Sequence, residues 1–345
     1  MVTGFHTDTE GSLSVVTISD VARAAGVSKA TVSRVLNNSN HAVNAATRQR
    51  VLEAMSALGF RPNALARSLY TKITHSVGLI IPDITNPYYS GIARGVEDVA
   101  SQGGYTVLLC DTDRRPEKEQ LAVNTLVEKR VEGIIVAGGG SAQASNLDEI
   151  ARDGIGVVLV GKHAMEFPAV RVDNVRGARE ATSHLIAQGH RHIACITGPA
   201  KSITSDERCQ GYLQALADAG LTDSYLARGD FRPESGYVAT RTLLARMPRP
   251  TAIFACNDLM ALGALRLAGE MGLRVPADLA LVGFDNIPVS SYLQPALTTV
   301  AVPMYELGTA AMTVLLQVVQ GKAVPPVSWL ELQLIVRESS KLQLS

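Results

Sequence analysis

The chain has 345 residues, 46% of them hydrophobic, and a formal net charge of zero. Such a composition excludes a fibrous or disordered protein, and the length allows two or three domains with separate cores. The charge is uneven, because residues 17–72 carry eight Lys and Arg against two Asp and Glu. This basic N-terminal segment is joined to a mildly acidic remainder, which predicts that the N-terminal segment alone binds a polyanion.

Residues 1–16 have neither a basic region nor an apolar stretch long enough for export, and no later run reaches about 18 apolar residues. We therefore expect a disordered tail over 1–16 and a cytoplasmic protein. The four cysteines form no CxxC motif and mostly lie in apolar runs, which predicts buried free thiols.

Two short helical patterns follow, separated by Gly26. Apolar residues recur at helical spacing over 18–25, and Gly26 can adopt the left-handed conformation that ends a helix. Ser28 can cap the second helix, and a third pattern covers 44–58. Helix, glycine turn, helix and supporting helix is the helix-turn-helix arrangement, whose second helix enters the major groove of DNA.

The second helix carries polar residues on its outward face. Lys29, Thr31, Ser33 and Arg34 are donors suited to base edges and phosphates. An ordinary small helical bundle with a polar face would give the same pattern. The excess of positive charge favours DNA binding.

A further helical pattern after Pro62 lasts about two turns before β-branched residues end it. Because a helix shorter than about 12 residues is marginal in water, this one needs a partner. We expect Leu69 to insert at a base step of the DNA minor groove. The alternative is that Leu65 and Leu69, four residues apart, pack against a neighbouring element.

From residue 76 the pattern changes to continuous apolar runs that alternate with amphipathic ones, and the alternation restarts after about residue 173. This predicts two lobes, each a parallel sheet covered on both faces. The only tryptophan, Trp329, lies in a late strand pattern and is expected in a core.

Polar residues gather after the predicted strands, where ligands of such sheets bind. They are Asp83, Asn86, Asp111, Asp113, Asn257, Asp258, Asp285 and Asn286. With Tyr88 and Tyr89 nearby, these groups suit a hydroxyl-rich or heterocyclic solute, whose faces stack on rings and whose edges pair with polar groups. Each Asp or Asn can equally be a helix N-cap, and we expect about half to be caps.

Ordered motifs from about residue 17 to about residue 338 resemble the LacI family of bacterial transcription regulators. They are TISDVARAAGVSKATVSRVLN, TRQRVLEAMSALGFRPNALARSL, VGLIIPDITNPYYSGIARGVE, GFDN and PALTTV. The resemblance implies an all-α helix-turn-helix headpiece and a two-lobed α/β effector domain like a type I periplasmic binding protein. It also implies a repressor that binds a palindromic double-stranded DNA operator as a homodimer, with a small-molecule effector, such as a sugar or related metabolite, and no cofactor.

The resemblance also implies domain bounds and site residues. The bounds are 17–62 for the headpiece, 63–75 for the hinge helix and linker, and 76–345 for the effector domain, with one lobe over about 76–173 plus 301–326 and the other over about 174–300 plus 327–345. The implied DNA contacts are Thr17, Ser28, Lys29, Ala30, Thr31, Ser33, Arg34, Asn37, Asn63, Ala66 and Leu69. The effector contacts, with Asp83 added from its position after a strand, are Asp83, Tyr88, Tyr89, Asn174, Arg208, Phe231, Asn257 and Asp285. The loop KSITSD lacks a second arginine, which argues against a purine corepressor.

Two other functions fit parts of the sequence. A transporter's solute-binding protein would have the same two-lobed body, but the missing export signal and the basic N-terminal segment argue against it. An enzyme would need a nucleophile, metal ligands or a phosphate loop. GVVLVGKH has the glycine spacing of such a loop but His163 in place of the hydroxyl, and His190 and His192 have no third ligand at a suitable spacing. We therefore predict no catalytic and no metal site.

Overall fold

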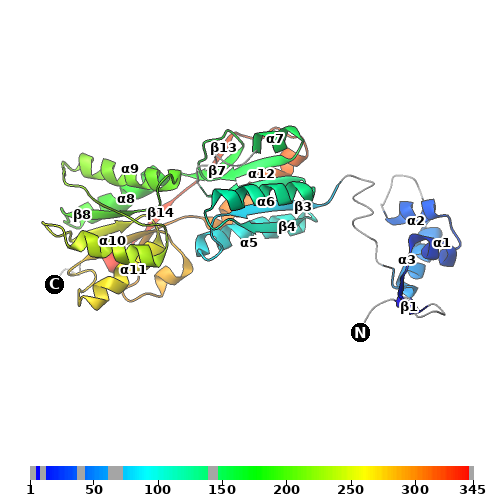
Figure 1. Ribbon diagram of the computed structural model, residues 1–345, viewed down its shortest axis with the longest axis horizontal. Coiled ribbons are helices and arrows are strands. Elements are labelled where there is room, and N and C mark those ends of the chain that lie inside the picture. Colours follow the sequence, from blue (N-terminus) through cyan, green and yellow to red (C-terminus); the bar gives the residue numbers. More distant parts are fainter. Residues whose placement is uncertain (1–4, 8–12, 37–42, 61–72, 139–146, 342–345) are drawn as a thin grey trace. The chain divides into compact units, whose positions relative to one another are not determined.

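The computed structural model describes residues 5–7, 13–36, 43–60, 73–138 and 147–341 (Figure 1). The chain divides into two compact units, Met1–Thr74 and His75–Ser345, each described here by itself.

The first unit is a three-helix headpiece. Its helices are α1 (Ile18–Ala25), α2 (Lys29–Leu36) and α3 (Ala45–Ala57). Val21, Val32 and Val51 are fully buried between them, as the helical spacing predicts. Gly26 ends α1 with φ +62°, the left-handed conformation expected there.

Side chains cap the starts of the headpiece helices. The backbone N–H of Thr31 donates to Ser28 Oγ at 3.1 Å, and that of Thr47 donates to Asn44 Oδ1 at 2.7 Å. These bonds satisfy amides that have no partner within a helix. The disordered tail expected over 1–16 is wrong in part, because β1 (Phe5–Thr7) and β2 (Leu13–Val15) form a short antiparallel pair.

The second unit contains two lobes, which we call lobe N and lobe C. The sheet of lobe N is parallel throughout and has the order β13-β7-β6-β5-β3-β4. Its elements are β3 (Ser76–Ile81), α5 (Pro87–Gln102), β4 (Thr106–Asp111), α6 (Pro116–Glu128), β5 (Gly133–Ala137), α7 (Leu147–Arg152), β6 (Gly156–Val160), β7 (Ala169–Val172), α12 (Met304–Val319) and β13 (Val327–Leu330).

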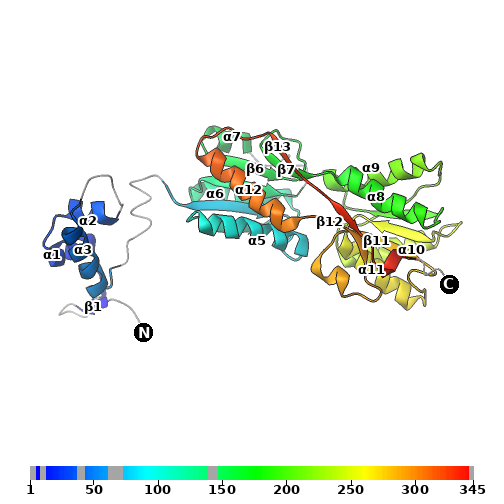
Figure 2. The ribbon, with the colours of Figure 1, turned by 180° about the vertical axis from the view of Figure 1, so that it is seen from behind.

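Both faces of this sheet are covered by helices. Leu79 packs in one hydrophobic cluster with α5 and α12, which lie side by side in Figure 2, whereas Ile80 packs in a second cluster with α6 and α7. Alternate residues of β3 therefore serve opposite cores, which explains its uninterrupted apolar run.

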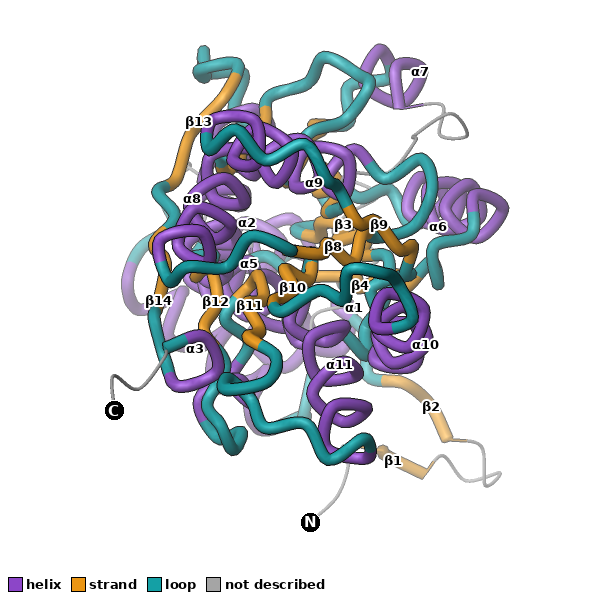
Figure 3. The backbone as a smooth tube through the Cα atoms, turned by 90° about the vertical axis from the view of Figure 1, so that its left-hand side faces the viewer, coloured by secondary structure: helices purple, strands orange, loops and turns teal. Residues whose placement is uncertain are grey.

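The sheet of lobe C has the order β14-β12-β11-β10-β8-β9, with β14 antiparallel to β12. Its elements are α8 (Asn174–Ala187), β8 (Ile193–Thr197), α9 (Ile203–Asp218), β9 (Tyr225–Arg228), α10 (Pro233–Leu244), β10 (Ala252–Ala255), α11 (Asp258–Glu270), β11 (Ala280–Asp285), β12 (Thr298–Ala301) and β14 (Gln333–Ile335), with short 3₁₀ helices at Pro288–Ser291 and Glu338–Ser340. Figure 3 shows α8 and α9 on one side of these strands and α10 and α11 on the other.

The described chain crosses between the lobes three times: after β7, after β12 and after β13. The third crossing corrects the expected lobe bounds, because residues 327–330 were assigned to lobe C. They form β13, which pairs with β7 in lobe N. Since β13 is an edge strand, Trp329 is 61% exposed and its predicted place in a core is wrong as well.

Within the described residues, no helix is both long enough and apolar enough to span a membrane.

Candidate functional site

A cavity of about 440 Å³ lies between the lobes, at the carboxyl ends of strands from both sheets. Residues predicted to contact an effector surround it: Tyr88, Tyr89, Asn174, Arg208, Phe231, Asn257 and Asp285. This volume falls within the range of small-molecule sites, and its position follows the rule for doubly wound sheets.

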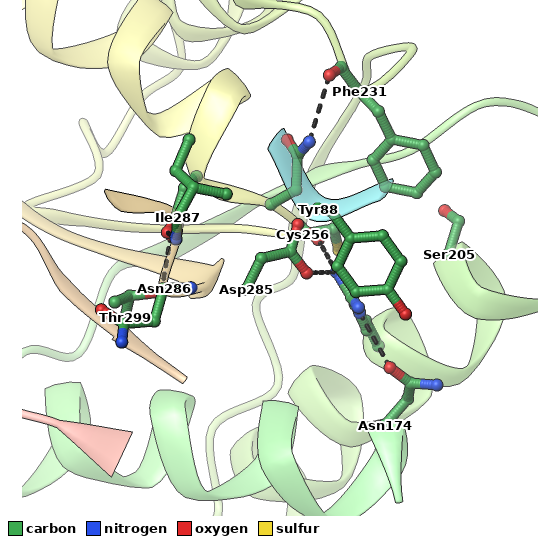
Figure 4. Close-up of polar contacts among 12 residues, drawn as sticks. Tyr88, Asn174, Ser205, Phe231, Cys256, Asp285, Asn286, Ile287 and Thr299 are labelled. Atoms are coloured by element: carbon green, nitrogen blue, oxygen red, sulfur yellow. Dashed lines mark hydrogen bonds and ion pairs between the residues drawn. The ribbon is translucent and has the colours of Figure 1, made fainter. Parts of the chain in front are cut away.

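A buried arginine organises the lobe C side of the cavity. Arg208 on α9 is 3% exposed, and its Nη1 donates to Asp285 Oδ1 at 3.0 Å and to the carbonyl oxygen of Cys256 at 2.6 Å. Its Nε donates to Asn174 Oδ1 at 3.0 Å, and its guanidinium lies 3.7 Å from the ring centroid of Phe284. Figure 4 shows Asn174, Asp285 and Cys256 around these contacts. Such a network fixes the direction of every donor before a solute arrives.

Asp285 is the charged partner of Arg208 in this network. Burial raises its pKa to about 6, although the neighbouring Arg208 opposes the rise. At pH 7 the carboxylate is therefore mostly ionised and can accept hydrogen bonds from a solute.

Aromatic rings line other walls of the cavity. Tyr88 and Tyr89 pack edge to face at the start of α5, with ring centroids 5.0 Å apart. Burial raises the pKa of both phenols, so they remain neutral donors at physiological pH. Phe231 has φ +71° and Asp285 has φ +108°, which are costly conformations for residues other than glycine. Two residues of the cavity wall are therefore held in strained backbone conformations.

Comparisons with known proteins agree over nearly the whole chain. Residues 17–63 match the family model "Bacterial regulatory proteins, lacI family", and residues 182–340 match that of a periplasmic binding protein-like domain. Catabolite control protein A of Priestia megaterium is 42% identical over 305 residues, covering 87% of this chain and 91% of the relative. The chain belongs to the LacI family.

Two solved structures of transcription regulators are similar in fold. The lac repressor dimer bound to operator and the anti-inducer ONPF has a TM-score of 0.86 at 33% identity, covering 95% of this chain and 99% of that chain. A complex of the regulator CelR with cellobiose has a TM-score of 0.72 at 34% identity, covering 94% and 99%. The predicted fold class, a helix-turn-helix headpiece followed by a two-lobed effector domain, is confirmed. The chain is a transcription regulator with a LacI-type DNA-binding domain.

The structure places the predicted DNA contacts of this LacI headpiece as follows. Lys29, Ala30 and Arg34 of α2 are exposed, and Thr31 and Ser33 are half-buried. Ser28 and Thr17 are exposed but engaged within the headpiece, since Ser28 Oγ caps α2 and the Thr17 hydroxyl donates to Asp20 Oδ2 at 2.6 Å. Asn37, Asn63, Ala66 and Leu69 lie outside the described residues, so the hinge stays a prediction.

Asp83 is an exception among the predicted effector contacts and requires a correction. It does not line the cavity. Instead, Asp83 Oδ1 accepts hydrogen bonds from the backbone N–H and the hydroxyl of Thr85, and its Oδ2 lies 3.5 Å from Arg232 Nε. Burial would raise its pKa, but the bonds from Thr85 and the nearby arginines outweigh burial and lower it.

Helix caps account for part of the polar residues at the strand ends. The Asn86 side chain accepts from the Tyr88 backbone N–H at 3.0 Å, and that of Asn257 accepts from the Met260 N–H at 3.0 Å. Both residues also line the cavity. Asn86 and Asn257 thus each cap a helix and line the cavity at the same time.

Sequence reasoning missed several residues of the cavity wall. Arg114, His163, Lys201 and Thr204 line it. Burial lowers the pKa of His163 to about 4, so its ring is neutral at pH 7. The first three follow β4, β6 and β8 by a few residues, so the strand-end rule applied to every polar residue type would have found them.

Another buried carboxyl, Asp258, directly follows Asn257 of the cavity wall and predicts a measurable pH effect. It accepts hydrogen bonds from Thr299 Oγ1 at 2.6 Å, Ser290 Oγ at 2.7 Å and Ile287 N–H at 2.9 Å. Burial, with the charge of Asp285, raises its pKa to about 7 against these bonds.

Because this pKa lies above its unfolded value, the folded state holds a proton that the unfolded state has lost between about pH 4 and pH 7. The carboxyl therefore contributes stability at low pH that is lost as the pH rises through 7. Unfolding in urea, carried out on the wild type and on Asp258→Asn, tests this effect. The free energy of unfolding of the wild type minus that of the variant should fall by about 1.4 kcal/mol per pH unit between pH 5 and 6.5. If the free energies of unfolding of the two proteins change equally with pH, Asp258 does not titrate in this pH range.

Proposed function

We propose that this LacI-family regulator is a repressor whose affinity for its operator is set by a hydroxyl-rich solute, a sugar or related metabolite, bound between lobes N and C. The buried Arg208–Asp285 pair beside the tyrosine rings supports this proposal most strongly. Its fixed donors and acceptors suit the hydroxyls of a sugar, and the rings of Tyr88 and Phe231 suit its apolar faces. Cellobiose in the similar CelR structure supports the same class.

The proposal includes the residues and the partners. The seven predicted residues that line the cavity are its effector contacts, joined by Arg114 and Thr204 from the opposite walls. The operator is a palindrome bound by a homodimer, in line with the operator-bound dimer of the similar lac repressor. The protein acts in the cytoplasm, where the DNA is.

The control of DNA binding follows from linkage. A solute that binds two arrangements of the lobes with unequal affinity shifts operator affinity by the difference, typically about 1 to 3 kcal/mol. A hinge helix too short to be stable alone folds in only one of these arrangements. A small change between the lobes is therefore enough to change the population that binds DNA.

The test begins with the purified chain and fragments of genomic DNA at 50 and 200 mM salt. A repressor retains specific fragments and loses affinity steeply with salt, whereas a transporter's solute-binding protein retains none. Thermal shifts with sugars, sugar acids, nucleosides and nucleobases then identify the solute class. Retention of no fragment under any of these conditions contradicts the proposal.

The exposed cations of α2 give a sharper prediction. Lys29→Ala and Arg34→Ala should each weaken binding to the retained fragment and reduce the slope of log K against log salt by about 1.8, because each removes two phosphate contacts from the homodimer, one in each protomer. Arg266→Ala is the matched control, since this arginine is exposed on α11 and pairs with Glu270 of the same helix. If the slopes of all three variants equal that of the wild type, α2 is not the DNA-reading helix.

A further inference from the structure

Among the described residues, ion pairs join the lobes at two places beside the cavity, which we call the first and the second latch. In the first latch, Lys162 Nζ after β6 of lobe N lies 3.2 Å from Glu207 Oε1 on α9 of lobe C. In the second latch, Arg232 of lobe C donates from Nη2 to Asp113 Oδ1 at 2.9 Å, and its Nε lies 3.5 Å from Asp83 Oδ2. Both aspartates follow strands of lobe N. Strands β5 and β3 lie between β6 and β4 in the sheet, so the two latches stand apart.

The first latch is connected to the cavity through hydrogen bonds. While Glu207 Oε1 faces Lys162, its Oε2 accepts from Asn174 Nδ2 at 3.0 Å. Asn174 Oδ1 in turn accepts from Arg208 Nε at 3.0 Å. An unbroken series of contacts thus runs from a lysine of lobe N to the arginine that faces the cavity.

The second latch is connected through the backbone. Arg232 directly follows Phe231, whose ring lines the cavity and whose φ is +71°. The Phe231 carbonyl accepts from Asn257 Nδ2 at 3.1 Å, and the Arg232 N–H donates to Asp230 Oδ1 at 2.9 Å. The guanidinium of Arg114 from lobe N also lies 5.2 Å from the Phe231 ring centroid. The position of this ring therefore depends on the contact between the lobes.

We propose that Lys162, Glu207, Arg232 and Asp113 are positioning residues that hold the lobes closed over the cavity and thereby set the affinity for the solute. Lys162 and Arg232 are 53% and 45% exposed and do not line the cavity, so they act without touching the solute. Exposed pairs add little to folding stability. Open and closed arrangements of two lobes typically differ by only a few kcal/mol, however, and a few-fold change in their ratio alters the population that binds the solute.

The statement about affinity rests on the proposed function, whereas the statement about closure does not. The first experiment therefore uses the full chain without solute or DNA. Dyes are attached through noncanonical amino acids at Leu121 on α6 and Val238 on α10, which are 65% and 62% exposed, and labelled chains are diluted into unlabelled ones. Single-molecule energy transfer then reports the ratio of open to closed molecules.

We expect Lys162→Met and Arg232→Met, which keep an apolar stem, each to raise the ratio of open to closed molecules about three- to tenfold, and the double variant to combine both effects. Lys162→Arg and Arg232→Lys should restore the wild-type ratio, because they keep the charge. Raising salt from 50 to 500 mM should open the wild type but not the double variant, since salt screens exposed pairs. Arg266→Ala, which breaks a pair within α11, is the control and should change nothing.

A wild-type ratio in both Met variants, with no salt response, overturns the proposal even if the protein binds DNA and solute as proposed. Opening of the Met variants upholds the closure statement even if no DNA fragment is retained. Where the screen has identified a sugar, its dissociation constant should rise in the Met variants by the factor by which the closed fraction falls. An unchanged constant in opened variants overturns the statement about affinity.

Discussion

Replacing Arg208 by alanine is expected to abolish solute binding, with a loss of more than about 100-fold in affinity, and to lower the free energy of unfolding by about 3 to 5 kcal/mol. The guanidinium has three hydrogen-bond partners in the buried network, Asp285, Asn174 and the Cys256 carbonyl. Its removal leaves the Asp285 carboxylate buried without its counter-ion, which is the costly way to break such a pair. The variant should still retain specific DNA fragments but should not respond to solute.

Urea unfolding and titration calorimetry measure these two effects. Arg176→Ala provides the control, because Arg176 is an exposed arginine on α8 whose ion pairs with Glu180 and Glu331 lie at the surface. Its loss should change the free energy of unfolding far less than Arg208→Ala does, because exposed ion pairs are screened by solvent. A similarly small effect of Arg208→Ala would mean that the buried pair does not organise the cavity.

The second large effect is expected from one glycine on α11. A Cβ added at Gly263 would collide with the backbone carbonyl of Pro233 and approach the backbone N–H of Tyr237, both on α10. Since backbone atoms of two packed helices cannot move aside cheaply, Gly263→Ala should lower the free energy of unfolding by about 3 kcal/mol or more.

Gly269 in the same helix gives a matched control, because nothing lies within 4 Å of a Cβ built there. Gly269→Ala should raise the free energy of unfolding by about 0.5 to 1 kcal/mol, since alanine loses less backbone entropy on folding. The two glycines lie six residues apart in one helix. Changes of opposite sign in the free energy of unfolding would therefore identify the close crossing of α10 and α11 as their cause. Equal effects would refute it.

The sequence predicted the architecture well because hydrophobic periodicity reports directly on burial. Continuous apolar runs such as β3 correspond to strands covered on both faces, and Gly26 ends α1 as expected. Local patterns say less about which sheet a late strand joins. β13 looks like any half-buried strand, and only its pairing with β7 places it in lobe N and leaves Trp329 exposed.

The candidate site was predictable in position but not in every residue. The strand-end rule located Asp285 and Asn257, but its use for Asp and Asn alone left out Arg114 and Lys201. Asp83 satisfied the rule and was still wrong, because it pairs with Arg232, 149 positions along the chain. An ion pair with a partner so far along the chain has no signature in a single sequence.

The three crossings between lobes N and C have a mechanical consequence. Three covalent tethers resist shear and twisting far more than a single linker does, so the soft motion left to this unit is a rotation about an axis near the tethers. A solute of any chemistry therefore changes the same quantity, the angle between lobes N and C. This angle is the only signal that the bound solute passes on. Regulators with this two-lobed fold can therefore change the metabolite that they bind by substitutions in the cavity wall, while the motion between the lobes stays the same.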